Sequence, residues 1–314
     1  MNLRHVRRED ADALYRLLRT CADAAEHEEE VTPESVARQF DVLGLDICRC
    51  MWVMPAEGQT LSAVVSAIPL CSNGLEVLHV GWHVHPSVRS LEFQEQLVRF
   101  AEERAPAVRI HPDLPAVLHA GIKGENKEKA RVLERLGYQP ARWFLELVRS
   151  LQEQLVQPMP PAGYSVRQGC ADADEIYAVA QEAFRDHWSQ PDITLDQFRF
   201  VMDALRGEEH LVHTARTESG EPVGVCLTRL RPAAKCASRA PEAEIALLAV
   251  LRAHRRKGLA TCLLLHALQW AREQGSGTAV ISVDSESLTG ADRLYRKLGF
   301  VERSRSVVYR KPLP

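Results

Sequence analysis

The sequence predicts a mixed α/β protein that contains two copies of one fold. A length of 314 residues with 46% hydrophobic side chains is enough for two domains of ordinary size, each with its own core. A segment that predicts a short strand followed by a helix, residues 6–15, returns at residues 166–177. The offset of roughly 160 residues is close to a domain length.

Two further echoes support the duplication. Residues 136–138, Leu-Gly-Tyr, correspond to residues 298–300, Leu-Gly-Phe, and residues 80–93 correspond to residues 246–259. Between the copies, residues 157–163 are rich in proline, which excludes both a helix and a central strand. We therefore expect this stretch to be a linker between a first domain at residues 1–157 and a second at residues 158–314.

The second copy shows its elements most clearly, because apolar residues at helical spacing predict helices and short apolar or alternating runs predict strands. In chain order we expect a strand at 164–167, helices at 172–184 and 195–205, a hairpin of 210–216 with 223–229, a loop at 231–241, a strand at 244–250, a helix from 259 to a glycine cap at 275, a strand at 278–283 parallel to 244–250, a helix at 289–297 and a strand at 306–310. His266, inside the helix that starts at 259, is expected to face solvent.

Residues 244–275 contain the most informative functional pattern. A buried strand runs into a basic turn, residues 255–257, and then into Gly258 at the start of a helix. The first N–H groups of a helix have no intrahelical partner and the helix dipole favours negative charge there, so this arrangement can bind a pyrophosphate. Gly258 and the small Ala260 allow a phosphate to approach the backbone. The glycine patterns of dinucleotide-binding folds and of P-loops do not fit.

The pattern R-x-x-G-x-A at residues 255–260 resembles the pyrophosphate loop of the GCN5-related N-acetyltransferases, the GNAT family. Glu244 begins the preceding strand, where several branches of that family carry the general base. Residues 291–300, ADRLYRKLGF, look like the family's A-x-x-L-Y-x-x-x-G-F, in which the tyrosine, here Tyr295, faces the CoA sulfur. The resemblance implies two tandem GNAT folds, each a mixed, mostly antiparallel sheet flanked by helices, with acetyl-CoA as the co-substrate.

The resemblance also implies the roles of individual residues. Direct acetyl transfer to an amine needs a base, a donor for the oxyanion and a proton for the departing thiolate. Glu244 would accept the proton directly or through a water, a backbone N–H near Val250 would polarise the thioester carbonyl, and Tyr295 would donate to sulfur. The residues implied to contact acetyl-CoA are Leu248, Ala249, Val250, Arg255, Arg256, Lys257, Gly258, Leu259, Ala260, Thr261 and Ser287. Ser287 stands where many members carry asparagine.

Each of these residues also has a purely structural interpretation. Glu244 can be a charge at the end of a strand, although alternation places it on the same face as Ala246, Leu248 and Val250. Tyr295 can be an aromatic residue of the core. Arg256 and Lys257 can lie in solvent near a 3′-phosphate without contributing to binding.

The first copy lacks the residues on which this chemistry depends. Arg89 aligns with Arg255, but Glu92 stands where Gly258 would be, and Leu133 occupies the place of Tyr295. A carboxylate would repel a pyrophosphate, and its Cβ would block the backbone approach. We expect a degenerate first domain that does not bind CoA; the alternative is binding through a shifted loop.

Composition excludes several other classes. A net charge of −3 with a pI near 6.5 gives no basic footprint for nucleic acid. The chain starts without an apolar signal region and has no long apolar run, so we expect a cytoplasmic protein with no membrane contact. The eight cysteines are scattered and are expected to be reduced thiols. His83 and His85 alternate on a predicted strand without a third ligand, and we expect no metal.

Three functions remain open from the sequence. The first is an acetyl-CoA-dependent N-acetyltransferase whose acceptor is a small-molecule amine, a protein N-terminus or a lysine. The second is a CoA-binding sensor or regulatory module without turnover, and the third is an interaction scaffold. Within the family, the two-copy layout is similar to that of mycothiol synthase. Acceptor, acyl-chain preference and oligomeric state do not follow from these motifs.

Overall fold

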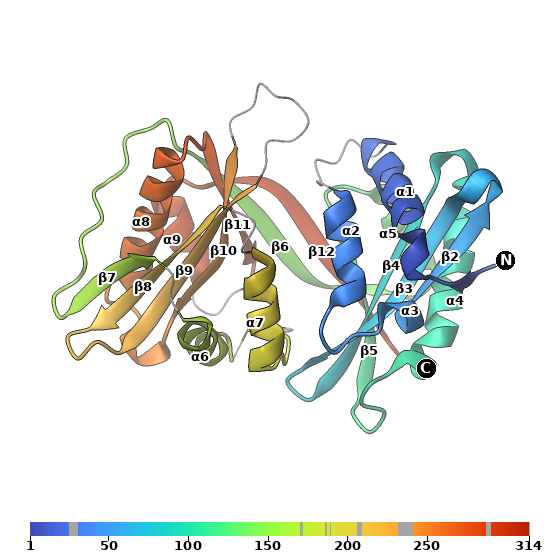
Figure 1. Ribbon diagram of the computed structural model, residues 1–314, viewed down its shortest axis with the longest axis horizontal. Helices are drawn as coiled ribbons and strands as arrows, with labels where there is room; N and C mark the ends of the chain where they lie inside the picture. The colour runs from blue at the N-terminus through green and yellow to red at the C-terminus, as the bar shows by residue number, and fades with distance from the viewer. Residues whose placement is uncertain are drawn as a thin grey trace. The chain divides into compact units, whose positions relative to one another are not determined.

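The computed structural model describes residues 1–24, 31–169, 172–185, 187–188, 190–205, 209–231, 241–286 and 290–313. The chain forms two compact units (Figure 1). Unit 1 consists of Met1–Trp143 together with Ser306–Pro314, and unit 2 consists of Phe144–Arg305. Each unit is a sheet with helices on both faces, so the predicted mixed α/β fold is confirmed.

Unit 1 is built on a sheet in which neighbouring strands are antiparallel except for one parallel pair, β4 with β5. Its strands, in spatial order, are β1 (Arg4–His5), β2 (Met51–Ala56), β3 (Thr60–Ser72), β4 (Leu75–Val84) and β5 (Ala116–Lys123). The helices are α1 (Ala11–Ala24), α2 (Pro33–Arg38), α3 (Ile47–Cys50), α4 (Leu91–Val108) and α5 (Lys127–Arg135). Leu14 and Val36 belong to the core on one face, and Leu97 and Leu133 to the core on the other.

Unit 2 repeats this plan. Its strands are β7 (Tyr164–Gly169), β8 (His210–Thr217), β9 (Pro222–Arg231), β10 (Glu242–Val250) and β11 (Thr278–Asp284), and again only one pair, β10 with β11, is parallel. The helices are α6 (Ala173–Phe184), α7 (Leu195–Ala204), α8 (Leu259–Glu273) and α9 (Ala291–Lys297). The helices α8 and α9 cover one face, and α6 and α7 cover the other.

The predicted elements of the second copy agree with the structure except near their ends. The hairpin is β8–β9, the strand at 278–283 is β11, and α8 ends as expected, because Gly275 has φ = 82° and Ser276 N–H donates to the Ala271 carbonyl at 3.0 Å. The final strand, β12 (Val301–Pro312), is longer than the predicted 306–310. Residues 232–240 of the predicted loop lie outside the described residues.

The last strand of each copy completes the sheet of the other copy. Residues 144–150 of β6 (Gln139–Ser150) pair antiparallel with β11 in unit 2, while residues 306–312 of β12 pair antiparallel with β5 in unit 1. The compact units therefore do not coincide with the predicted halves 1–157 and 158–314. Local patterns identify a strand, but they do not identify its partner.

A buried histidine distinguishes the core of unit 2. His213 on β8 is 1% exposed and stacks on His266 of α8 with ring centroids 5.6 Å apart, so His266 does not simply face solvent as expected. Neither ring nitrogen of His213 has a hydrogen-bond partner among the described residues. Burial, with a smaller effect of the charge of His266, lowers the pKa of His213 to about 4.

This histidine makes stability dependent on pH in a defined direction. In the unfolded chain the pKa of His213 is about 6.5, so protonation favours unfolding as pH falls from 6.5 towards 4. The expected loss at pH 5, relative to pH 7, is about 2 kcal/mol. We expect His213→Phe to remove most of this loss in urea titrations at the two pH values, whereas the exposed His111→Gln leaves it unchanged. Equal pH dependence in all three proteins would contradict the assignment.

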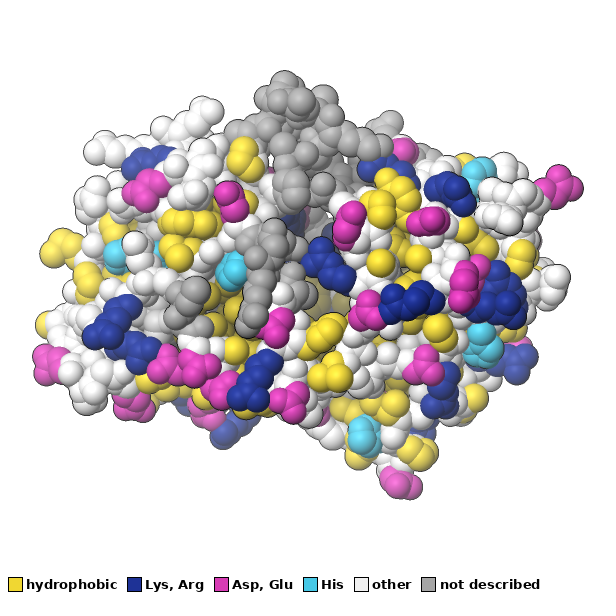
Figure 2. All heavy atoms as spheres, in the orientation of Figure 1, with side chains coloured by type: hydrophobic (Ala, Val, Ile, Leu, Met, Phe, Trp, Pro, Cys, Tyr) yellow, Lys and Arg dark blue, Asp and Glu magenta, His cyan; other side chains and the backbone are white. Residues whose placement is uncertain are grey.

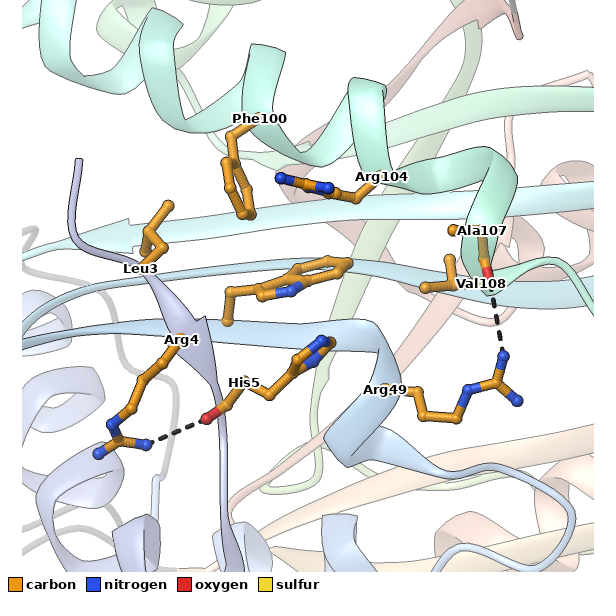
Figure 3. Close-up of a pocket in the computed structure, with 9 residues that line it drawn as sticks. Leu3, Arg4, His5, Arg49, Phe100, Arg104, Ala107 and Val108 are labelled. Carbon is orange, nitrogen blue, oxygen red and sulfur yellow. Dashed lines mark hydrogen bonds between the residues drawn. The ribbon is translucent and has the colours of Figure 1, made fainter.

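Neither the charges on the face in Figure 2 nor the two cavities below mark the predicted acetyl-CoA site. On the face in Figure 2, Lys and Arg side chains lie interspersed with Asp and Glu. A cavity of about 440 Å³ lies in unit 1 (Figure 3), and another of about 340 Å³ lies in unit 2 between β7 and the β8–β9 turn. None of the residues expected to contact acetyl-CoA lines either cavity. Among the described residues, no helix combines the length and the apolar character needed to cross a membrane.

Candidate active site

Strand β10 contains a bulge and then leaves its parallel neighbour. Ile245 pairs with Thr228 and Leu247 pairs with Leu227, so Ala246 is an extra residue on β10. On its other side, β10 pairs with β11 only at residues 242–244. Among the described residues, the edge of β10 from Leu247 to Val250 therefore has no strand partner on that side. Such an edge can pair with an extended ligand.

The turn that follows β10 has the backbone of an anion site. Arg256 has φ = 63° and Gly258 has φ = 88°, so two left-handed residues lie within three positions. The N–H of Cys262 donates to the Gly258 carbonyl at 3.0 Å, which is the first hydrogen bond of α8. The N–H groups of residues 259–261 precede that bond and have no intrahelical acceptor. Their direction and the helix dipole favour a phosphate at this point.

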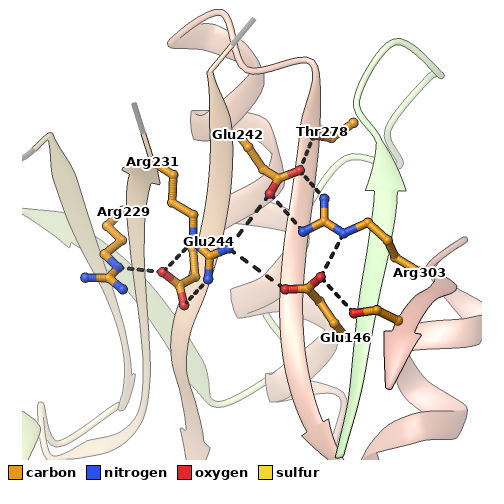
Figure 4. Close-up of polar contacts among 8 residues, drawn as sticks. Glu146, Arg229, Arg231, Glu242, Glu244, Thr278 and Arg303 are labelled. Atoms are coloured by element: carbon orange, nitrogen blue, oxygen red, sulfur yellow. Dashed lines mark hydrogen bonds and ion pairs between the residues drawn. The ribbon is translucent and has the colours of Figure 1, made fainter. Parts of the chain in front are cut away.

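Glu244 lies in a network of charges that crosses the sheet of unit 2 (Figure 4). Arg231 forms two bonds to its carboxylate, Nε to Oε2 at 3.0 Å and Nη2 to Oε1 at 2.8 Å, and Arg229 Nε donates to Oε2 at 2.6 Å. The network continues through Glu242 and Arg303, whose Nη1 and the Glu242 Oε1 are 2.6 Å apart. Glu244 is thus a partly buried carboxylate clamped by two guanidinium groups.

The clamp controls the proton affinity of Glu244. Burial raises the pKa of this carboxyl group, but the hydrogen bonds and charges of Arg231 and Arg229 outweigh burial and hold the pKa below its usual range. Glu244 is therefore ionised at neutral pH and is a weak base. It can orient a water or an amine, but it accepts a proton less readily than an isolated glutamate.

The bulge changes which face of the strand Glu244 occupies. Ala243 and Ile245 belong to the core under α8, and after the bulge at Ala246 it is Leu248 and Val250 that face this core. Glu244 points to the opposite face. The expectation that it shares a face with Leu248 and Val250 is therefore wrong, because one extra residue shifts the alternation by one.

Tyr295 is part of the core of unit 2 and is 5% exposed. Its ring meets Phe300 edge-on with centroids 5.9 Å apart. Burial first, and then the neighbouring Cys226, raise the pKa of the phenol above its ordinary value, so the hydroxyl keeps its proton at neutral pH. Burial raises the pKa of the Cys226 thiol to about 12, which makes this sulfur a poor nucleophile.

Known proteins share both the sequence pattern and the fold. Residues 173–300 match the Acetyltransferase (GNAT) family. These residues, which form most of unit 2, carry a GNAT domain. The chain is accordingly classed as an N-acetyltransferase, and the sheet of each unit is the mostly antiparallel sheet expected from the motifs.

Individual relatives agree with this assignment. Mycothiol acetyltransferase of Jonesia denitrificans is 28% identical over 211 residues, which are 65% of this chain and 65% of that protein. A GCN5-related N-acetyltransferase from Sphaerobacter thermophilus superposes over 99% of this chain and 95% of its own with a TM-score of 0.71 at 25% identity. A tandem GNAT protein from the clavulanic acid biosynthesis pathway covers 100% and 98% with a TM-score of 0.74; at 17% identity it shows the fold alone.

The first arginine of the GNAT loop pattern holds the loop in place. Arg255 Nε donates to the Val250 carbonyl at 3.1 Å, and its Nη2 donates to the Ala183 carbonyl at 2.7 Å. The guanidinium thus ties the turn to the end of β10 and to α6. Sequence reasoning grouped Arg255 with the phosphate contacts, but these bonds give its side chain a positioning role.

Lys257 is held beside the same turn by Tyr164, the first residue of β7. Its Nζ donates to the Tyr164 hydroxyl at 2.9 Å, and that hydroxyl lies 2.9 Å from His254 Nδ1. A Cβ added at Gly258 would lie 3.7 Å from Pro161. The segment from Pro161 to Tyr164 therefore packs against the GNAT loop and holds a positive charge there. Ser287 lies outside the described residues.

The corresponding place in unit 1 is filled by its own side chains. Glu92 is the second residue of α4, so helix occupies positions that correspond to the loop of unit 2. Lys129 Nζ donates to the Trp82 carbonyl at 2.9 Å, on the strand residue that corresponds to Leu248. Trp82 Nε1 donates to Gln94 Oε1 at 2.9 Å, and Gln94 Nε2 donates to Glu128 Oε1 at 2.7 Å. These contacts agree with the expectation of a degenerate first copy, which stays a prediction.

Sequence reasoning missed two features of the GNAT site. The predicted strand ends at Arg229 and the predicted loop begins at Arg231, but both residues lie on β9, and their spacing of two puts them on the face of Glu244. Gly224 was not singled out; a Cβ there would lie 3.1 Å from Leu263 Cδ1 and 3.3 Å from the Ala249 carbonyl. A glycine opposite Val250 lets α8 approach the sheet closely. Among the described residues, no group of three or more His, Cys, Asp or Glu is placed to hold a metal.

Proposed function

We propose that this GNAT chain transfers an acetyl group from acetyl-CoA to the amine of a small-molecule acceptor, and that unit 2 carries out the reaction. The observation that supports it most is the turn with Arg256 and Gly258 in left-handed conformation, directly before the open N-terminus of α8 and directly after the unpaired edge of β10. Members of this family in general use acetyl-CoA as donor.

Donor binding would use backbone groups more than side chains. The N–H groups of residues 259–261 would bind the pyrophosphate, with Arg256 and Lys257 adding positive charge. The backbone of residues 248–250 would pair with the pantetheine arm along the free edge of β10. The side chain of Arg255 would keep these two parts in register through its bonds to Val250 and Ala183.

In the transfer step a C–N bond to the acceptor forms and the C–S bond of the thioester breaks. The proton lost by the amine would pass through a water to Glu244. The carboxylate of this residue is ionised and can accept a proton, although the two arginines make it a weak base. The thiolate that leaves would receive a proton from Tyr295, which the raised pKa of the phenol keeps available. A backbone N–H near Val250 would stabilise the oxyanion.

The acceptor class rests on the relatives. Several curated relatives are named mycothiol acetyltransferases, which supports a small-molecule amine rather than a protein N-terminus or a lysine side chain. A second candidate function is a CoA-binding sensor without turnover. The observations in its favour are that two arginines already donate three bonds to the Glu244 carboxylate, and that Tyr295 lies within the core.

Calorimetric titration with acetyl-CoA tests the proposed site. We expect one binding site per chain and a loss of affinity of about 100-fold or more in Gly258→Glu, because this change adds a carboxylate to the phosphate site and a Cβ at φ = 88°. The control is Gly58→Glu, which makes the same substitution at φ = 66° in an open turn of unit 1.

The outcomes separate the possibilities. Loss of binding in Gly258→Glu but not in Gly58→Glu places the donor at the turn of unit 2. Two sites per chain would show that unit 1 also binds CoA and would contradict its assignment as degenerate. Absence of binding at about millimolar acetyl-CoA would contradict the proposed function as a whole.

A further inference from the structure

The cavity of about 440 Å³ in unit 1 lies away from the part of the fold that corresponds to the GNAT site. It opens between β1, the start of β2 and the C-terminal half of α4 (Figure 3). Its wall on α4 includes Phe100 and Arg104, whereas the GNAT loop corresponds to residues 89–94, at the other end of the helix. Arg104 lies fourteen positions after the N-cap Ser90, a rise of about 21 Å along the helix. A ligand in this cavity would therefore not be a second donor.

The wall of the cavity is a rigid aromatic cluster. Trp52 on β2 is 4% exposed, and its ring centroid lies 5.4 Å from that of His5 and 5.6 Å from that of Phe100, which it meets edge-on. These three rings come from three different elements and fix one another by packing. They offer ring faces and edges against which a flat ligand can pack.

Two further guanidinium groups line the cavity beside these rings. Arg104 lies 5.2 Å from the centroid of the Phe100 ring, and Arg49 Nη2 is 3.5 Å from the Ala107 carbonyl. Neither forms an ion pair with a carboxylate among the described residues. Arg4, at the edge of the same cavity, is different, because Asp10 accepts two hydrogen bonds of 2.7 Å from it. Two cations without a counter-charge thus remain beside an aromatic wall.

We propose that this cavity binds a small organic anion that carries a flat ring, such as an aryl phosphate or an aryl carboxylate. Arginine recognises phosphate and carboxylate oxygens through paired N–H donors. The ring would pack against Trp52 and Phe100, and the anion would lie between Arg49 and Arg104. The volume is in the range of small-molecule sites, about 300 to 1,000 Å³. Unit 1 then has a binding function of its own, in a copy of the fold that has lost the donor loop.

Titration of the full chain with phenyl phosphate tests this proposal. The titration is made in the presence of saturating acetyl-CoA, so that the turn of unit 2 is not available to the probe. We expect saturable binding at one site, weakened about tenfold or more in the double variant Arg49→Gln/Arg104→Gln. Arg99→Gln is the matched control, because it removes an exposed arginine of α4 that does not line the cavity. Quenching of tryptophan fluorescence that is lost in Trp52→Phe is a second readout.

Three outcomes would overturn the proposal. They are equal affinity of the double variant and the wild type, equal affinity for phenyl phosphate and inorganic phosphate, and no saturable binding up to about 10 mM probe. Two variants distinguish a failure of this proposal from a failure of the proposed function. Gly258→Glu is expected to abolish acetyl-CoA binding and to leave phenyl phosphate binding unchanged, and the arginine double variant is expected to do the opposite.

Discussion

Glu244→Gln is expected to reduce acetyl transfer about 100-fold or more while acetyl-CoA affinity stays within about twofold. Glutamine keeps the size of the side chain but cannot accept a proton from a water or an amine. Donor affinity should not change, because the proposed donor contacts are made by the turn at Gly258 and the edge of β10. The measurement is steady-state kinetics with an accepted amine, together with calorimetry of acetyl-CoA binding.

Glu242→Gln is the control for this experiment. Glu242 belongs to the same network, two residues earlier on the same strand, and its carboxylate contacts Arg303 and Thr278. A general effect of breaking the network would reduce activity to a similar extent in both variants. Equal activities of the two variants would therefore reject a specific role of Glu244 in the reaction. Full activity of Glu244→Gln would reject it as well, and full donor binding without turnover in the wild type would favour the sensor.

The arginine clamp adds a pH dependence with a defined sign. The charges of Arg231 and Arg229 hold the pKa of Glu244 below its usual range, so loss of activity through its protonation is expected only at acidic pH. Arg231→Gln removes the bidentate partner and should raise this pKa. In kcat/KM measured against pH, the acidic limb is expected to move to higher pH in this variant. An unchanged limb would show that another group controls it.

The parts of the site that sequence could predict are those determined by local backbone chemistry. Gly258 and Gly275 mark the two ends of α8 because both have φ above 80°, where other residues are strained. Apolar residues at helical spacing predicted that helix correctly. Such features depend only on neighbouring residues in the chain, so a single sequence is enough to predict them.

The parts that could not be predicted depend on residues far apart in the chain. The bulge at Ala246 follows from pairing with β9, and it moved Glu244 to the opposite face of the sheet. The bond of Arg255 to Ala183 requires a helix that lies 72 residues away in the chain. The closure of the unit 1 site requires the bond of Lys129 to Trp82, which lies 47 residues away. The periodicity of the sequence does not indicate which of these distant residues contact one another.

Because the last strand of each copy pairs in the sheet of the other copy, unit 2 begins before the predicted linker. This predicts a large difference in folding between two fragments of the chain. A fragment of residues 158–314, the predicted second domain, is expected not to fold, whereas residues 144–305 are expected to unfold cooperatively. The longer N-terminus adds the residues of β6 that pair with β11 and four leucines of the unit 2 core. Those leucines are Leu145, Leu147, Leu151 and Leu155, which are 8%, 0%, 1% and 6% exposed.

The magnitude follows from this burial. Each leucine contributes about 1.5–3 kcal/mol, so the four together contribute about 6–12 kcal/mol. A domain has about 5–15 kcal/mol of total stability, and the fragment 158–314 would lose an amount comparable to all of it. It would also lose the ion pair of Glu146 with Arg303 and expose the edge of β11 to other chains. Circular dichroism, thermal unfolding and solution size of the two fragments are the measurements.

The full chain supplies an independent version of the same test. Leu147→Asp places a charge at a fully buried position of β6 and should destabilise the sheet of unit 2, which hydrogen exchange would detect as faster exchange along β11. The control Arg142→Asp changes a residue of β6 outside the segment that pairs with β11. Cooperative folding of 158–314, together with protected β11 amides in Leu147→Asp, would show that β11 does not need β6. The opposite result makes the strand at residues 144–150 a part of the domain that we propose to perform the chemistry, although it precedes the predicted linker in the sequence.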